Sequence, residues 1–185
     1  MTKFVTPAKT LALFLTSTLA AGTTAATAQD YSDWEFALIG QTCHVYTNAA
    51  ARDTSGSLDF TFGPNGFNAG FTYIYRPWPG EENEPPWDEQ NDYVRIDIDN
   101  EEIWLGEEMF FGANANSYTA DLTSGFVGEM LAAVSTAQQT VDFMVYRAEF
   151  DEAWLYGRFS VAGFNDTLAK AVEVCAFDPS RLPES

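Results

Sequence analysis

The side chains that most often carry out chemistry are scarce in this chain. It has one histidine and two cysteines among 185 residues. His44 directly follows Cys43, and the second cysteine, Cys175, lies near the C-terminus. A single imidazole excludes sites built from several histidines, and two thiols exclude a four-thiolate zinc site. The remaining interpretations are a Cys43 nucleophile beside His44 and a Cys43–Cys175 disulfide.

Carboxylates are by contrast abundant, with 27 Asp and Glu against nine Lys and Arg and a formal net charge of −18. Two suitably separated carboxylates can hydrolyse a glycoside, but so many acids always contain such a pair. No Gly-x-Ser-x-Gly elbow accompanies His44, which we interpret as a strand-surface residue. We therefore expect a protein that is not an enzyme and needs no cofactor. A pI near 4.1 also excludes a nucleic-acid partner.

The acid-rich stretch 81–108 suggests calcium, which prefers six to eight oxygen ligands. Its weak candidate ligands are Asp97, Asp99 and Glu101. The stretch lacks the glycine and spacing of an EF-hand loop. A strand would also send Asp97 and Asp99 to one outer face, as in a solvated edge protected by charge. We favour the solvated edge and predict no metal site.

A proline-rich segment at 76–92 is a second candidate site. It begins at Arg76 and contains Trp78 and Trp87, and its proline density excludes a central strand. Exposed tryptophans would form a platform for a sugar ring or for the apolar anchor of a partner. The alternative, which we favour for each tryptophan singly, is that they fold back over the open end of a sheet.

The first residues have the three parts of a secretory signal peptide. Lys3 and Lys9 precede an apolar run at 11–20, and Ala26-Thr27-Ala28 provides a cleavage site. The run is about half of the ~20 residues that span a bilayer, so we expect no membrane anchor. The protein is therefore predicted to be periplasmic or secreted. Outside the cytoplasm an even cysteine count favours the disulfide, stabilising the fold by roughly 4 to 5 kcal/mol.

Hydropathy alternates with a period of two across much of the chain, which is typical of half-buried antiparallel strands. Alternating segments occupy 34–38, 43–47, 58–62, 71–75 and 94–98, with a hairpin at 141–161 turning at Asp151-Glu152. Helical spacing at 124–139 and from Asn165 to Cys175 predicts two helices. We expect a mainly β fold, an antiparallel β-sandwich-like core with two packed α-helices. Its boundaries would be a signal peptide at 1–28, one domain at 29–178 and a flexible tail at 179–185.

The end of the chain resembles a known family. Arg158-Phe159-Ser160-Val161-Ala162-Gly163-Phe164, followed by Leu168-Ala169-Lys170-Ala171, is similar to the closing strand and helix of the invasion-associated locus B family. Trp34 and Cys43 also match an early tryptophan and a first cysteine of that family. The resemblance implies an exported alphaproteobacterial protein with a β-sandwich-like core and no catalytic residues, linked to the cell envelope or host contact.

These observations predict an exported, non-catalytic envelope or surface protein that binds another protein, in the envelope or on a host surface. The candidate binding residues are Arg76, Trp78 and Trp87. The alternative is a carbohydrate- or calcium-binding module that uses the 76–102 loop and hairpin.

Overall fold

The computed structural model describes residues 33–50, 55–77, 79–80, 85–106, 109–114 and 117–183. The predicted signal peptide at 1–28 and the candidate Trp78 lie outside the described residues.

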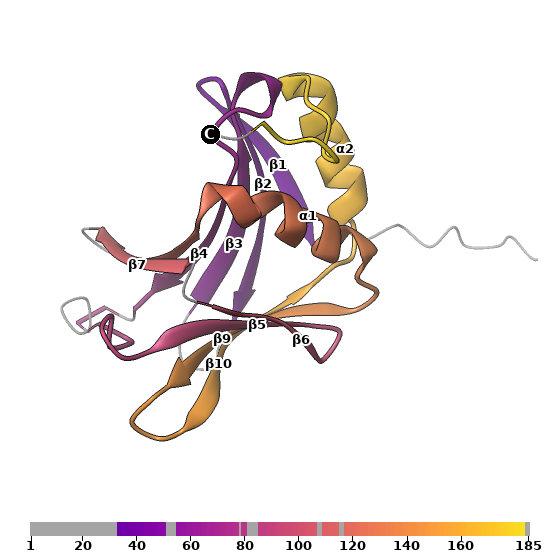
Figure 1. The fold of residues 1–185 in the computed structure, drawn as a ribbon. Coiled ribbons are helices and arrows are strands. Elements are labelled where there is room, and N and C mark those ends of the chain that lie inside the picture. Colours follow the sequence, from indigo (N-terminus) through magenta and orange to yellow (C-terminus); the bar gives the residue numbers. More distant parts are fainter. Residues whose placement is uncertain are drawn as a thin grey trace, which may run out of the picture.

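The described residues form two antiparallel sheets, which confirms the mainly β prediction (Figure 1). The six-stranded sheet has the order β1-β2-β3-β4-β8-β7. Its strands are β1 (Trp34–Ile39), β2 (Thr42–Ala50), β3 (Ser55–Phe62), β4 (Gly70–Arg76), β8 (Ser117–Leu122) and β7 (Met109–Asn114). The four-stranded sheet has the order β10-β9-β5-β6. Its strands are β10 (Glu152–Ser160), β9 (Thr140–Arg147), β5 (Tyr93–Ile98) and β6 (Glu101–Gly106).

Two α-helices accompany the sheets, as the helical spacing predicts. The helix α1 (Val127–Thr136) follows a short 3-10 turn at Ser124–Phe126, and α2 (Phe164–Cys175) follows β10. In Figure 1, α2 lies beside β1 and β2, while α1 crosses the six-stranded sheet near its middle. No helix among the described residues combines the length and the apolar character needed to cross a membrane.

The core is formed by the apolar faces of the strands, as the alternation of hydropathy along the sequence predicts. Leu58, Phe60 and Phe62 of β3 are fully buried, whereas Asp59 and Thr61 between them are partly exposed. Tyr73 of β4 stacks on Phe143 of β9 with ring centroids 3.8 Å apart, so the two sheets share one core. The other face of the six-stranded sheet is partly exposed and carries polar residues such as Asp59 and Thr61 together with apolar ones such as Ile39, and we call it the outer face.

The disulfide prediction is confirmed. Cys43 on β2 is bonded to Cys175, the last residue of α2, with their Cα atoms 6.3 Å apart. Both cysteines are buried. The bond therefore fastens α2 to the inner face of the six-stranded sheet, where Phe164 at the other end of the helix packs against Trp34.

Some details differ from the sequence-based expectations. The sequence analysis predicts no strand at 101–122, where the structure has β6, β7 and β8. Asp99 was expected on a strand but lies in the turn after β5. The β9–β10 turn includes residues 148–151, slightly before Asp151-Glu152. In the segment predicted as a tail, Leu182 packs partly buried against the core.

Candidate functional site

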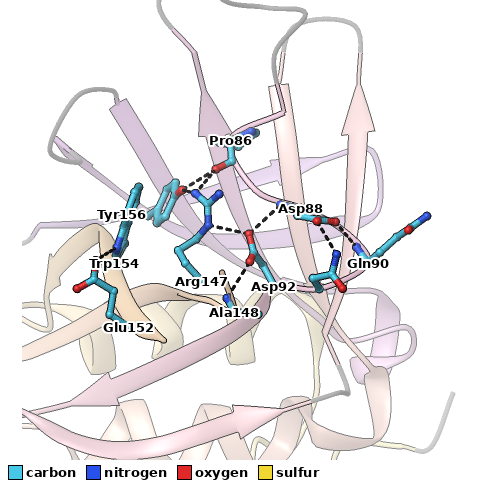
Figure 2. A network of polar contacts seen from close by, with 10 residues as sticks. Pro86, Asp88, Gln90, Asp92, Arg147, Ala148, Glu152, Trp154 and Tyr156 are labelled. Atoms are coloured by element: carbon cyan, nitrogen blue, oxygen red, sulfur yellow. Dashed lines mark hydrogen bonds and ion pairs between the residues drawn. The ribbon is translucent and has the colours of Figure 1, made fainter. Parts of the chain in front are cut away.

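The described part of the proline-rich segment, residues 85–92, packs against the hairpin formed by β9 and β10 (Figure 2). The Tyr156 hydroxyl of β10 donates a hydrogen bond to the Pro86 carbonyl at 2.6 Å, and Arg147 Nη1 donates to the same oxygen at 3.1 Å. Figure 2 shows these side chains converging on the loop from one side. The loop is therefore attached to the hairpin through its backbone.

An ion pair between Asp92 and Arg147 is the centre of this attachment. Arg147 Nε lies 2.7 Å from Asp92 Oδ2, and the two side chains are 18% and 3% exposed, respectively. Asp92 also accepts the backbone N–H of Asp88 at 2.8 Å and that of Ala148 at 3.2 Å. A buried carboxylate with several donors is well compensated, so Asp92 joins the loop to the hairpin turn.

Asp88 organises the loop locally. Its carboxylate accepts the backbone N–H of Gln90 at 2.9 Å and the side-chain amide of Asn91 at 2.6 Å, an Asx-type turn. The hydrogen bond from the Asn91 side chain, followed by the one from the Gln90 backbone, lowers the pKa of the Asp88 carboxyl. Asp88 and Asp92 thus accept hydrogen bonds from backbone N–H groups of the loop itself.

Trp87, a predicted binding residue, is only 3% exposed. Its indole is surrounded by the rings of Tyr75, Phe111, Tyr118 and Tyr156, with the Phe111 centroid 4.8 Å away. Its Nε1 is buried without a hydrogen-bond partner in the described part of the chain. Trp87 therefore folds back over the sheet end, the alternative favoured from sequence, and offers no exposed platform.

Arg76 lies apart from Trp87. It ends β4 on the outer face, and its Nη1 donates to Ser57 Oγ at 3.1 Å. Trp87 contacts the neighbouring Tyr75. Because adjacent strand residues point to opposite faces, the structure does not bring these two predicted residues together.

The exposed aromatic surface lies instead on the β9–β10 hairpin. Trp154 is 39% exposed and Phe150 is 50% exposed, and their rings stack with centroids 5.2 Å apart. The Arg147 guanidinium carbon lies 4.9 Å from the Trp154 ring centroid, and Trp154 Nε1 donates to Glu152 Oε1 at 2.7 Å. We call Arg147, Phe150 and Trp154 the Trp154 platform.

A second aromatic pair lies on the opposite face of the same sheet. Tyr93 stacks on Tyr146 with centroids 4.9 Å apart, and Tyr93 is partly exposed. Tyr146 pairs with Ala153, the neighbour of Trp154, so the two aromatic pairs face in opposite directions. A hydrogen bond to Asp151 raises the pKa of Tyr146 to about 12, which keeps this phenol neutral at ordinary pH.

Two of the three weak calcium candidates, Asp97 and Asp99, are engaged in structural contacts. Both carboxylate oxygens of Asp97 accept from Arg95, at 2.7 and 2.9 Å. Asp99 accepts the backbone N–H groups of residues 138, 139 and 140, which lowers its carboxyl pKa. Glu101 is exposed on β6. Across the described ranges, no three His, Cys, Asp or Glu side chains are grouped as a metal site would require.

His44 lies on the outer face of β2, where its Nδ1 is 2.8 Å from Asp59 Oδ2 of β3. Sequence reasoning assigned His44 to a strand surface but missed Asp59 as its partner. It also missed the Trp154 platform. The sequence did offer one indication for Trp154: it follows the acidic residues of a predicted hairpin turn, where a side chain is often exposed.

No protein-family model matches the chain, and neither a curated protein nor a solved structure matches it. The functional proposals therefore rest on the arrangement of these residues.

Proposed function

We propose that this protein is an exported, non-catalytic protein of the envelope or cell surface, and that it binds another protein through the Trp154 platform. The observation that carries the proposal is an exposed tryptophan stacked on an exposed phenylalanine at the tip of a fixed hairpin. Trp, Tyr and Arg are the residues that most often dominate binding energy at protein interfaces.

The rigid mounting of the platform supports this function. Arg147 contacts the Trp154 ring and is itself fixed by Asp92, which lies in the loop before β5. Tyr156, two residues from Trp154, is held by its hydrogen bond to Pro86. Side chains already ordered before binding lose less conformational entropy when the complex forms, so more of the contact energy appears as affinity.

The charge around the platform indicates the chemistry of the partner. Glu149, Asp151 and Glu152 are exposed in and beside the hairpin turn, and the whole chain carries a formal charge of −18. Complementary charge speeds association and suppresses unsuitable partners. The expected partner therefore presents an apolar pocket for the aromatic pair, with lysine or arginine residues at its rim.

The export part of the proposal rests on the N-terminal pattern and the cysteines. A signal-peptide pattern at 1–28 and a disulfide between Cys43 and Cys175 both suit an oxidising compartment. A periplasmic or secreted location follows as part of the same proposal.

The alternative function, a carbohydrate- or calcium-binding module on the 76–102 segment, has less support. Trp87 is enclosed by other rings, and Asp97 and Asp99 are engaged by Arg95 and by backbone N–H groups. An exposed Trp154 would also suit stacking against a sugar ring, so the test must separate a protein from a glycan.

The test is a crosslinked pull-down from envelope extract, followed by affinity measurement with the purified partner. Trp154→Ala and Phe150→Ala should each weaken binding by about 2 kcal/mol, or roughly 30-fold. Phe110→Ala is the matched control, because Phe110 is 62% exposed but lies on β7 of the other sheet. Raising the salt concentration should slow association.

Equal capture by the wild type and by Trp154→Ala would refute the assignment of the site. Capture that disappears after enzymatic removal of glycans would support the carbohydrate alternative instead.

A further inference from the structure

The strand β7 (Met109–Asn114) is the last strand of the six-stranded sheet and pairs with one neighbour, β8. Figure 1 shows it at the outer end of that sheet. Alternate residues of an edge strand point their N–H and C=O groups away from the neighbouring strand. Within the described part of the chain, no backbone hydrogen bond outside the β7–β8 pair reaches residues 109–114. This edge is therefore open to another strand.

The β7 edge lacks the features that protect the other sheet edges. Its sequence, MFFGAN, contains no charged residue and no proline, and its register with β8 is regular. In the four-stranded sheet, irregularities interrupt the register of both edge strands, β6 and β10. The edge strand β1 carries Glu35 and contacts α2. A regular, uncharged edge is a template for strand addition, so β7 is the edge that best fits a further strand.

The strand is fixed on its inner side and accessible on its outer side. Met109 is buried, and the Phe111 ring stacks on Trp87 with centroids 4.8 Å apart. Phe110 lies on the outer face in register with Asp121, and it is 62% exposed. The strand is thus held by the core while it presents a large apolar ring to solvent.

A gap lies beside this ring on the same face. Gly112 is two residues after Phe110, and residues two apart share one face of a strand. A Cβ atom at Gly112 would lie 2.8 Å from Thr119 Oγ1 of β8, so this position suits glycine. The outer side of β7 therefore combines one projecting ring with one position that has no side chain.

The charge near the edge indicates which strand fits it. Asp121 is the one charged residue of β7 and β8, and its two carboxylate oxygens accept hydrogen bonds from the hydroxyls of Thr72 and Thr119. A basic segment would find no free carboxylate on these two strands, and charges farther than about 8–10 Å are largely screened at physiological salt. The edge therefore suits a strand that is itself uncharged, as β7 of another copy is.

We propose that β7 pairs with β7 of a second copy of this chain, antiparallel about a two-fold axis perpendicular to the sheet, so that two six-stranded sheets join into one. When Phe111 lies opposite Phe111 of the other copy, Phe110 of each copy lies opposite Gly112 of the other. Each ring then covers a glycine, and this cross-strand pair forms twice. The interface lies on a different sheet from the Trp154 platform and does not depend on the proposed protein partner.

The order of charges in the sequence favours the antiparallel orientation. Glu107 and Glu108 directly precede β7, whereas Ala115, Asn116 and Ser117 follow it. Parallel pairing would bring the acids of the two copies together, and antiparallel pairing separates them.

The test is sedimentation of the purified protein at concentrations up to about 1 mM. We expect a reversible equilibrium between monomer and dimer. Added salt should strengthen the dimer, because each copy carries a formal charge of −18 and salt screens the repulsion between copies. Amide hydrogen exchange at low and high protein concentration locates the interface. Alternate amides of β7 should gain protection only at concentrations where the dimer forms.

Substitutions at Phe110 test the contact between the copies. Phe110→Ala should weaken dimerisation ~10-fold, since the contact with Gly112 occurs twice in each dimer. Phe110→Glu should leave the protein monomeric, because it places a like charge at the interface. Trp154→Ala is the matched control, an exposed aromatic residue of the other sheet, and should dimerise as the wild type does. Circular dichroism checks that every variant is folded.

The proposal is overturned if the protein is monomeric at every concentration and salt level, if salt weakens the dimer, or if the β7 amides gain no protection. Dimerisation of Phe110→Glu at the strength of the wild type would also overturn it. Loss of the dimer in Trp154→Ala would do the same, because the platform would then be the interface.

Discussion

Removal of the disulfide should lower the free energy of unfolding by about 5 kcal/mol. The bond joins residues separated by 132 positions, and both cysteines are buried between α2 and β2. On the chain-entropy model, closing a loop of this length removes about 5 kcal/mol of conformational freedom from the unfolded chain at 25 °C. For a domain of this size, each kcal/mol corresponds to roughly 2–4 °C, so Tm should fall by about 10–20 °C.

Urea unfolding followed by tryptophan fluorescence measures this effect. Three samples are compared: the oxidised wild type, the wild type with dithiothreitol, and the double variant Cys43→Ala, Cys175→Ala. Mass spectrometry first confirms that the oxidised protein is lighter by the two hydrogens lost on disulfide formation. The samples without the bond should also show a larger m-value, because their unfolded chains expand and expose more surface.

The two readouts test the reasoning separately. A stability difference below about 1 kcal/mol between oxidised and reduced protein would refute the claim that a long closed loop constrains the unfolded state. A large stability difference with an unchanged m-value would place the effect in the folded state, where the bond holds α2 against β2.

Two further predictions concern carboxylates that join separate elements. Asp92→Ala should destabilise the fold by about 3 kcal/mol, because it leaves the partly buried Arg147 without its ion-pair partner. The control is Glu89→Ala, since Glu89 is an exposed acid of the same loop, and this change should alter the stability in urea little. For Asp99, backbone N–H groups hold the carboxyl pKa below its ordinary value of 3.8. Its contribution to stability is therefore present above pH 3.8 and lost as the pH falls through the lower folded-state value. Asp99→Asn should consequently be less stable than the wild type at pH 7, and the gap in urea midpoint should narrow as the pH is lowered toward 2; a gap independent of pH would contradict this.

Several strands could be predicted from sequence because one face of each is buried and the other is exposed to solvent. In β3, Phe60 and Phe62 alternate with Asp59 and Thr61, and no knowledge of the neighbouring strands is needed to see this. The strand β8 has the same signal, with Tyr118, Ala120 and Leu122 alternating with polar residues, and was missed. The strand β7 is harder, since adjacent Phe110 and Phe111 followed by Gly112 hide the alternation.

The candidate site was less predictable than the fold. The long proline-rich segment was identified as unusual, but its Asp88 and Asp92 bind backbone N–H groups and Arg147, and Trp87 is buried. The exposed tryptophan lies on a regular hairpin that gave no compositional signal. Composition marks where a chain departs from ordinary strands and helices, but it does not report which side chains remain accessible.

The sequence by itself determined the acidic character, the alternation of the strands and the pairing of the two cysteines. These properties depend on residue identity, on local period or on a simple count. Only the tertiary structure decided that Trp87 is enclosed while Trp154 is exposed, and that Asp59 of β3 lies beside His44 of β2. Exposure and proximity depend on how elements distant in the chain pack together. That packing minimises the free energy of the whole molecule rather than of any one segment.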